Sequence, residues 1–241
     1  GDYPGGSGNF NQTALALRGS RFHNGVSRIH GSKASQMEGY VWPQIPTSEN
    51  PIGFVTNGIH VPTFLAREWA NLLDLQFGGG WRNELVNPTY WDRQIEAIPD
   101  YSFWSLRRSL KAKLLEEAYR RVVRQLRRNG CSESELQRLT WHLDPTETDV
   151  LTLGFGRRFA TYKRATLLFS EPQRLARLLN DPERPVIIMF AGKAHPKDRP
   201  GQQLIRKIHE FSRQPEFQGK IILIEDYDLS LARSLVMGVD V

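Results

Sequence analysis

The chain contains 241 residues, of which 39% are hydrophobic and 24% charged, as is usual for a folded globular protein. Its formal net charge of +6 favours anionic partners such as phosphates, nucleic acid or acidic surfaces. No apolar run is long enough to span a bilayer and no signal peptide is visible, so no membrane partner is expected.

The single cysteine, Cys131, excludes an internal disulfide framework and suits a reducing compartment, which predicts a cytoplasmic protein. We expect an inert thiol, because no His or Asp adjoins it in the sequence. The chain begins with Gly1 rather than Met, and residues 238–241 read as the start of a strand. We therefore expect a piece of a longer chain, cut at both ends.

The N-terminal part has weak local signals. Residues 1–9 are rich in glycine and are expected to form a loop. The apolar stretch 10–17 fits either a helix or a strand. His23 and His30 lie seven residues apart, but no third ligand or metal-binding spacing accompanies them, so no metal site is predicted.

The middle of the chain has helical periodicity. A first helix is expected from about Thr63 and ends at the glycines 78–80. Asn87 followed by proline predicts the start of a second helix. The apolar residues expected to face a core from this second helix are Trp91, Ile95 and Ile98.

A long basic helix is expected next, because apolar residues recur every three or four positions from 103 to 126. Asn129 and Gly130 would end it, and the Ser132–Glu135 spacing predicts a capping box for a shorter helix. Its basic face is interpreted as a solvated surface rather than a nucleic-acid groove, because no aromatic residues are interleaved with the cations.

From residue 149 onward strands and helices alternate. Strands are expected at 150–155, 185–191 and 220–224, and a fourth begins at Val239. The helices between them are expected at 162–180, with a break near Pro172, and at 200–213 and 229–237. Continuous apolar strands separated by amphipathic helices predict an α/β fold with a parallel sheet covered on both faces.

The stretch 151–165 is the strongest candidate for a functional site. Its cations follow the first predicted strand and would lie at the start of a helix, where the helix dipole opposes positive charge; they are Arg157, Arg158, Lys163 and Arg164. A bound anion would reverse these repulsions, and Gly154 and Gly156 would let backbone N–H groups approach it. The pattern therefore predicts a phosphate site at the carboxyl edge of the sheet.

Five segments together resemble the α-glucan (glycogen and starch) phosphorylases, closest to the short bacterial and archaeal type. They are NGVSRIHG (24–31), TNGIHVPTFLAREW (56–69), GFGRRFATYKRA (154–165), FAGKAHP (190–196) and IEDYDLSLARSLVMGVDV (224–241). They occur in order and span nearly the whole chain. The resemblance implies a GT-B-like fold with the active site in a cleft between two domains. It also implies phosphorolysis of terminal α-1,4-glucosyl residues to α-glucose 1-phosphate with retention.

The resemblance divides the chain into three parts. Residues 1–57 would end the N-terminal glucan-binding domain, 58–148 would form a helical connecting region, and 149–241 would start a truncated Rossmann-like domain. The implied partners are α-1,4-glucan or maltodextrin and orthophosphate, with no nucleic acid and a possible homo-oligomer.

The resemblance also assigns the site. The implied cofactor is pyridoxal 5′-phosphate, whose phosphate assists proton transfer. By motif, Arg158 and Lys163 match catalytic ligands of the substrate phosphate. The residues that match sugar contacts are His30, Asn57 and Tyr162, and those that match cofactor contacts are Arg157, Tyr227 and Phe64.

Some features depart from the family pattern. Phe64 stands where tryptophan is usual, and the stretch 32–38 differs from the common sequence. The cofactor-binding lysine would lie beyond Val241, so the isolated chain is expected to be inactive. Two other hypotheses remain open: a nucleotide-sugar glycosyltransferase resembling glycogen synthase, and a basic nucleic-acid-binding module.

Overall fold

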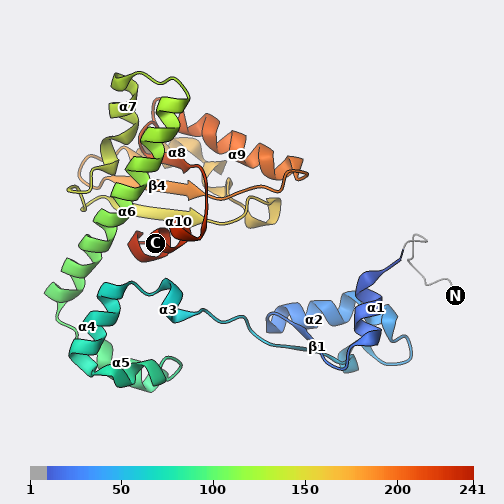
Figure 1. Cartoon of the computed structure of the whole chain (residues 1–241). Helices are drawn as coiled ribbons and strands as arrows, with labels where there is room; N and C mark the ends of the chain where they lie inside the picture. Colours follow the sequence, from blue (N-terminus) through green and yellow to red (C-terminus); the bar gives the residue numbers. More distant parts are fainter. Residues whose placement is uncertain (1–9) are drawn as a thin grey trace. The chain divides into compact units, whose positions relative to one another are not determined.

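The computed structural model describes residues 10–241, so the glycine-rich stretch 1–9 lies outside the described part. The chain divides into two units, Gly1–His60 and Val61–Val241. Each unit combines helices with a parallel sheet, which confirms the predicted α/β class (Figure 1). Among residues 10–241, no helix has the length and apolar character needed to cross a membrane.

The first unit is a small parallel pair of strands joined by a helix. Its elements are α1 (Gln12–Gly19), β1 (His23–Gly25), α2 (Arg28–Met37) and β2 (Ile52–Phe54). The ambiguous stretch 10–17 is therefore mostly helical, and Asn11 caps α1 by accepting a hydrogen bond from the Ala14 N–H. Ser27 caps α2 in the same way through the His30 N–H.

Glycines allow α2 to lie directly on the two strands. A Cβ atom on Gly25 would approach the Gly31 backbone nitrogen to 2.5 Å, and one on Gly31 would approach the Gly53 carbonyl oxygen to 2.7 Å. Since real Cβ atoms do not approach backbone so closely, larger residues at these positions would push the helix off the sheet.

The second unit is built on a three-stranded parallel sheet in the order β3–β4–β5. Its strands are β3 (Leu151–Gly156), β4 (Val186–Ala191) and β5 (Ile221–Ile224). Its helices are α3 (Val61–Phe64), α4 (Arg67–Phe77), α5 (Pro88–Ile95), α6 (Asp100–Arg128), α7 (Glu133–Thr140), α8 (Pro172–Leu179), α9 (Arg199–Ser212) and α10 (Leu229–Gly238). The three predicted strands are confirmed to within a residue or two.

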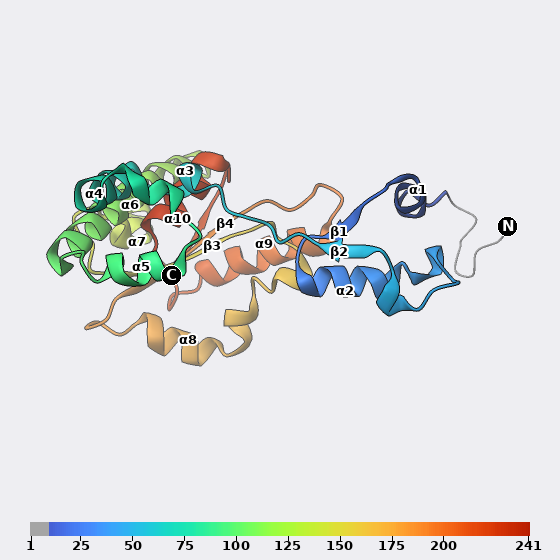
Figure 2. The same cartoon turned by 90° about the horizontal axis from the view of Figure 1, so that it is seen from below.

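Both faces of this sheet are covered, because alternate residues of β4 point to opposite sides. Met189 and Ala191 join a core formed with α6, α7 and α10. Ile188 and Phe190 join a second core with α8 and α9. Figure 2 shows α8 and α9 on one side of β3 and β4, with α6 and α10 on the other. The sheet covered on both faces is confirmed.

The segment after α10 lies along the free side of β3. The Asp240 N–H donates to the Thr152 carbonyl at 2.9 Å, and the Gly154 N–H donates to the Val241 carbonyl at 2.8 Å. Odd-numbered residues of β3 bond to β4, as in the bond from the Leu151 N–H to the Pro185 carbonyl. The fourth strand predicted from Val239 is thus present as backbone pairing, although it is not a regular strand.

The long basic helix is confirmed as α6, and Gly130 follows its end with φ +77°. The predicted capping box between Ser132 and Glu135 is also confirmed. However, the basic residues of α6 do not all face solvent. Lys111 is buried, donates to the Val150 carbonyl at 2.9 Å and pairs with Asp240 at 2.5 Å.

The helical region before α6 differs from the expected pattern in two places. The helix predicted from Thr63 is split into α3 and α4, because Ala66 is extended (ψ 145°). Ile95, expected in a core, is 59% exposed, since it lies in the last turn of α5. Trp91 is half-buried instead, donating its indole N–H to the Glu84 carbonyl at 2.8 Å.

Candidate functional site at the carboxyl edge of the sheet

The segment that follows β3 is a loop, so the helix predicted over 162–180 is wrong before residue 172 and is confirmed from there as α8, next to the predicted break at Pro172. Only a short 3₁₀ turn, Thr161–Lys163, forms before Arg164, whose φ of +54° ends it. The regular helix α8 starts at Pro172, because proline is favoured at the first helical position and disfavoured inside a helix. The cations of this loop, which we call the basic loop (residues 157–164), therefore do not lie at a helix N-terminus.

The glycines of β3 have a different role from the one predicted. The Gly154 N–H already donates to the Val241 carbonyl and is not available to an anion. A Cβ atom on Gly154 would lie 2.7 Å from a methyl carbon of Val239, and one on Gly156 would lie 3.5 Å from the Tyr227 hydroxyl oxygen. These glycines thus make room for the segments that pack against β3.

The charge of the basic loop is not neutralised within the part of the chain that the structure describes. Arg157, Arg158 and Arg164 are exposed, and none of them forms an ion pair with an acidic residue among residues 10–241. Lys163 is half-buried, and its Nζ lies 5.0 Å from the centroid of the Tyr162 ring. Cations that lack protein partners and lie in one loop form a suitable place for an anion.

The ends of the three strands meet at this loop. The Arg157 N–H donates to the Ala191 carbonyl at 3.1 Å, and the Phe159 N–H donates to the Lys193 carbonyl at 3.0 Å. From the end of β5, the Tyr227 hydroxyl donates to the Gly156 carbonyl at 3.3 Å. The segments that follow the three strands therefore lie together at one edge of the sheet. No hydrogen bond joins Arg158 directly to Lys163 in the described residues.

Two non-glycine residues at this edge have left-handed backbone, Arg164 (φ +54°) and Asp226 (φ +56°). Such a conformation costs about 1–2 kcal/mol for an ordinary residue. It persists where the surrounding structure holds it, as is common at functional sites. Arg164 is the last residue of the basic loop, and Asp226 directly precedes Tyr227. The backbone is therefore held in an uncommon conformation in both segments.

Arg121 of α6 is a contributor to this edge that the sequence does not reveal. Its guanidinium donates to the Asp226 carbonyl at 2.9 Å and pairs with Asp228 at 3.3 Å. Asp228 in turn caps α10 by accepting from the Leu231 N–H at 2.8 Å. Arg121 therefore holds the β5–α10 loop that carries Tyr227. The bonding partners are more than 100 residues apart, and on sequence alone Arg121 belongs to a solvated helix face.

Phe64, predicted as a cofactor contact, is half-buried at the end of α3. The helix α3 contacts α10, which starts just after Tyr227. Phe64 therefore lies in α3 and Tyr227 just before α10, and these two helices pack together. The two rings make no direct contact in the described residues.

The two predicted sugar contacts of the first unit meet around Val26. The His30 Nδ1 accepts the Val26 N–H at 3.0 Å, and the Asn57 N–H donates to the Val26 carbonyl at 3.2 Å. Because Nδ1 is an acceptor, the neutral ring carries its proton on Nε2, which is the nitrogen left for a ligand. Both side chains are exposed. Backbone bonding through Val26 is a relation that sequence spacing alone does not show.

No group of three or more His, Cys, Asp or Glu side chains in residues 10–241 is arranged to hold a metal ion. The basic loop and Tyr227 bring cationic, aromatic and hydroxyl groups to the carboxyl edge, where the carboxylate of Asp228 pairs with Arg121. This donor set is chemically suited to phosphate and sugar groups.

Comparison with known proteins gives a consistent picture, although no family model matches the chain. Over 232 residues, or 96% of its length, the chain is 39% identical to maltodextrin phosphorylase of Thermococcus litoralis. The identities to the glycogen phosphorylases of Aquifex aeolicus and Mycobacterium tuberculosis are 38% and 37% over the same share of the chain. The match covers 27%, 32% and 26% of those proteins, respectively. The chain is therefore similar over nearly its whole length to maltodextrin and glycogen phosphorylases, and it spans about a quarter to a third of the length of these relatives.

Proposed function

We propose that the protein containing this chain is an α-glucan phosphorylase, which cleaves terminal α-1,4-glucosyl residues with orthophosphate and releases α-glucose 1-phosphate with retention. The observation that carries the proposal is the basic loop, whose arginines have no acidic partner in the described residues. Its supports are the similarity to maltodextrin and glycogen phosphorylases and the position of the loop at the carboxyl ends of parallel strands.

In this proposal Arg158 and Lys163 bind the substrate phosphate. Their positive charge would hold the dianion beside the glycosidic bond and offset the negative charge that develops as the bond breaks. Hydrogen bonds to β4 and to Lys193 hold the backbone of the loop at residues 157 and 159, on either side of Arg158. Holding charge in place in advance avoids reorganisation during the reaction.

The proposed sugar contacts are His30, Asn57 and Tyr162. The His30 Nε2–H and the Asn57 amide would donate to hydroxyl groups of the glucosyl unit, and the exposed Tyr162 ring would face it. His30 would keep its donor in one tautomer, because Nδ1 already accepts the Val26 N–H.

The residues present fit pyridoxal 5′-phosphate as a cofactor. Arg157 is an exposed cation for its phosphate, Tyr227 supplies a hydroxyl at the same strand edge, and Phe64 supplies an aromatic surface. When bound, the cofactor would supply a phosphate that exchanges a proton with the substrate phosphate. The cofactor phosphate and the substrate phosphate would repel each other strongly in a site without water. The several arginines and lysines of the basic loop provide cations for both phosphates.

The GT-B architecture, the division at residues 57 and 148, cytoplasmic location and a homo-oligomer belong to the same proposal. A nucleotide-sugar glycosyltransferase would also use an Arg/Lys pair, but the relatives found by comparison are phosphorylases. Nucleic-acid binding has no specific observation in its favour.

The proposal is tested on the full-length protein loaded with pyridoxal phosphate. Glucose 1-phosphate should appear from maltoheptaose only when orthophosphate is present. Arg158→Ala and Lys163→Ala should each lower kcat/KM for phosphate by about 10²–10³, the usual loss for one preorganised charge. Arg177→Ala removes an exposed arginine from α8 and is the matched control, with no change expected.

The outcome also separates the alternatives. Turnover of UDP-glucose without orthophosphate would favour the glycosyltransferase. Wild-type rates in both basic-loop variants would remove the assignment of Arg158 and Lys163. Binding of nucleic acid that disappears at physiological salt would show charge attraction only.

A further inference from the structure

One face of α6 holds the loop that joins β5 to α10. Arg121, Gln125 and Arg128 are three or four residues apart and therefore lie on the same side of the helix. Arg128 forms an ion pair with the Glu225 carboxylate, and the Gln125 side-chain oxygen accepts the Glu225 N–H at 3.4 Å. These three side chains, which we call the α6 clamp, line a recess of about 410 Å³ together with residues 225, 226 and 228 of the loop.

Arg121 connects the clamp to both sides of Tyr227. Its side chain is 17% exposed, and each of its three guanidinium nitrogens has an acceptor. Nε donates to Glu117 at 2.6 Å, and the two terminal nitrogens donate to the Asp226 carbonyl at 2.9 Å and to the Asp228 carboxylate at 3.3 Å. A planar guanidinium fixes the relative positions of its acceptors, whereas a lysine ammonium acts as a point charge. Arg121 therefore holds the residues before and after Tyr227 in one arrangement.

The polar contact of Tyr227 is made to β3. Its hydroxyl donates to the carbonyl of Gly156, the last residue of that strand, at 3.3 Å. Gly156 directly precedes Arg157, the first residue of the basic loop. On the other side, the carbonyl that Arg121 binds belongs to Asp226, whose left-handed backbone (φ +56°) needs support from its surroundings. A shift of this loop would thus move the Tyr227 hydroxyl relative to Arg157.

We propose that Arg121 is a positioning residue of the cofactor-phosphate site. By binding residues 226 and 228, it sets the Tyr227 hydroxyl against Gly156, the residue before Arg157. The inference rests on the proposed function, in which Arg157 and Tyr227 contact pyridoxal phosphate. Arg121 acts without touching the cofactor, because all three of its nitrogens are bonded to protein.

The first test reads the position of Tyr227 in the cofactor-free, full-length protein. Fluorotyrosine is placed at position 227, and its fluorine chemical shift is measured by NMR. Arg121→Met, which keeps an unbranched side chain but no donors, should move this shift toward its value in urea. Arg121→Lys should move it as well, although it keeps the charge, because an ammonium does not reproduce the planar fork. An unchanged shift in Arg121→Met would overturn the proposal.

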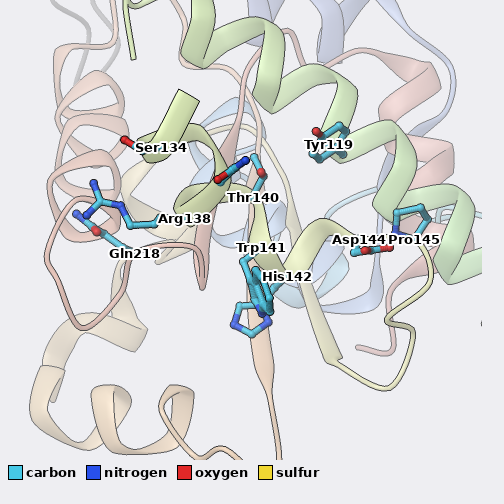
Figure 3. Close-up of a pocket in the computed structure, with 10 residues that line it drawn as sticks. Tyr119, Ser134, Arg138, Thr140, Trp141, His142, Asp144, Pro145 and Gln218 are labelled. Atoms are coloured by element: carbon cyan, nitrogen blue, oxygen red, sulfur yellow. The ribbon is translucent and has the colours of Figure 1, made fainter. Parts of the chain in front are cut away.

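Two variants of α6 control for lost charge and for loosened helix packing. Arg124→Met removes an exposed arginine that lines the same recess and has no ion pair in the part of the chain that the structure describes. Tyr119→Ala acts two residues before Arg121 and so about 200° around the helix. Figure 3 shows Tyr119 on the lining of a separate groove that includes Trp141 and His142. Both variants should keep the parental shift; a shift as large as that of Arg121→Met would overturn the assignment to Arg121.

The second test measures the dissociation constant of pyridoxal phosphate from the reconstituted full-length enzyme. Tyr227→Phe and Arg121→Met should each raise this constant about tenfold, the order expected for one hydrogen bond to a charged group. The double variant should bind no more weakly than either single variant, because Arg121 acts through Tyr227. Additive losses would show that Arg121 affects the cofactor by another route and would overturn the proposal.

A further variant decides the question if Arg121→Met does not fold. Asp228→Ser removes the carboxylate that pairs with Arg121 but can still cap α10 at the Leu231 N–H, because serine is a favoured N-cap residue. It should move the fluorine shift of position 227 in the same direction, and an unchanged shift would overturn the proposal. A parent that binds no pyridoxal phosphate, with the differences in fluorine shift intact, would overturn the proposed cofactor site alone and leave Arg121 as the residue that positions Tyr227.

Discussion

Single residues at the strand ends decide how closely the basic loop approaches the sheet. Gly192 follows β4, and a Cβ atom there would lie 2.0 Å from the Arg157 carbonyl oxygen and 3.0 Å from the Phe159 ring. This contact lets the Arg157 N–H and the Phe159 N–H reach their partners on β4 and the following residues. The position of the cations therefore depends on a residue that carries no charge.

Gly192→Ala should consequently lower both stability and activity. The added methyl group has to displace backbone rather than a flexible side chain, which costs about 1–3 kcal/mol in a well-packed site. We expect a lower midpoint of thermal unfolding and, for the proposed phosphorolysis, a raised KM for orthophosphate. Gly80→Ala is the matched control, because a Cβ atom on Gly80 has nothing within 4 Å. A Gly192→Ala enzyme with parental stability and KM would show that the loop position does not depend on this contact.

At the residue scale, the sequence reveals charge but not pairing. Neither the lack of an acidic partner for Arg157 and Arg158 within residues 10–241 nor the bonding of His30 and Asn57 to Val26 can be read from the sequence. The same limit applies to Lys111, which reads as part of a solvated helix face and is in fact buried beside Asp240. Amphipathic spacing cannot distinguish a cation that faces water from one that faces a buried carboxylate.

Among the elements, short polar contacts fix the turn that follows α4. The Asp74 carboxylate accepts from the Trp81 indole N–H at 2.9 Å and from the Arg82 guanidinium at 2.9 Å, and Arg82 lies 4.4 Å above the Trp81 ring. The hydrogen bond from Arg82, followed by that from Trp81, lowers the pKa of Asp74 to about 2. This cluster, in which Trp81 is buried and the other two side chains are partly exposed, joins the end of α4 to the 3₁₀ turn Gly79–Asn83.

A lowered pKa of a carboxyl group predicts the sign of a pH effect. The unfolded chain binds a proton at the ordinary Asp pKa of 3.8, whereas the folded chain does so only near pH 2. The stabilisation by Asp74 is therefore present above pH 3.8 and is lost as the pH falls toward 2. The difference in unfolding temperature between the parent and Asp74→Asn should be constant from neutral pH to about pH 5 and should shrink below pH 4. A difference that grows in acid would contradict this account.

The helices and strands were predictable wherever packing alone decides the pattern. The apolar spacing of α6 and the buried runs of β3, β4 and β5 are read correctly, because each element has a continuous apolar face or run. The helix predicted over 162–180 fails before residue 172 because Leu167 and Leu168 suggest an apolar face but are 61% and 48% exposed. The left-handed backbone of Arg164 prevents a helix there, and an arginine in the sequence does not predict that conformation.

In the second unit as a whole, one buried charge network connects α6 to the segment that follows α10. Asp240 accepts the Thr152 N–H at 2.9 Å and pairs with Lys111 at 2.5 Å and with Arg107 at 3.7 Å. Arg107 also donates to the Met237 carbonyl at 2.9 Å. The network holds the fourth backbone segment beside β3.

A double-mutant cycle at this network should show strong coupling. Asp240→Asn leaves the buried Lys111 ammonium without its counter-charge and should destabilise the fold by about 3–5 kcal/mol. Adding Lys111→Met removes that stranded charge, so the double variant should be more stable than the sum of the single effects predicts. Denaturant unfolding of the intact protein measures each variant. Additive effects would mean that the two groups do not interact in solution.

The parallel arrangement of both sheets has a consequence for how this polypeptide emerges from the ribosome. Neither β1 nor β3 can pair with its neighbour in the sheet by a tight hairpin, since a complete crossover segment must be synthesised before β2 or β4 appears. More than 20 further residues must therefore be translated before β1 or β3 can form backbone hydrogen bonds with its neighbouring strand. Nascent chains of this protein should accordingly depend more on chaperone protection while these crossovers are being made than after α10 has been released.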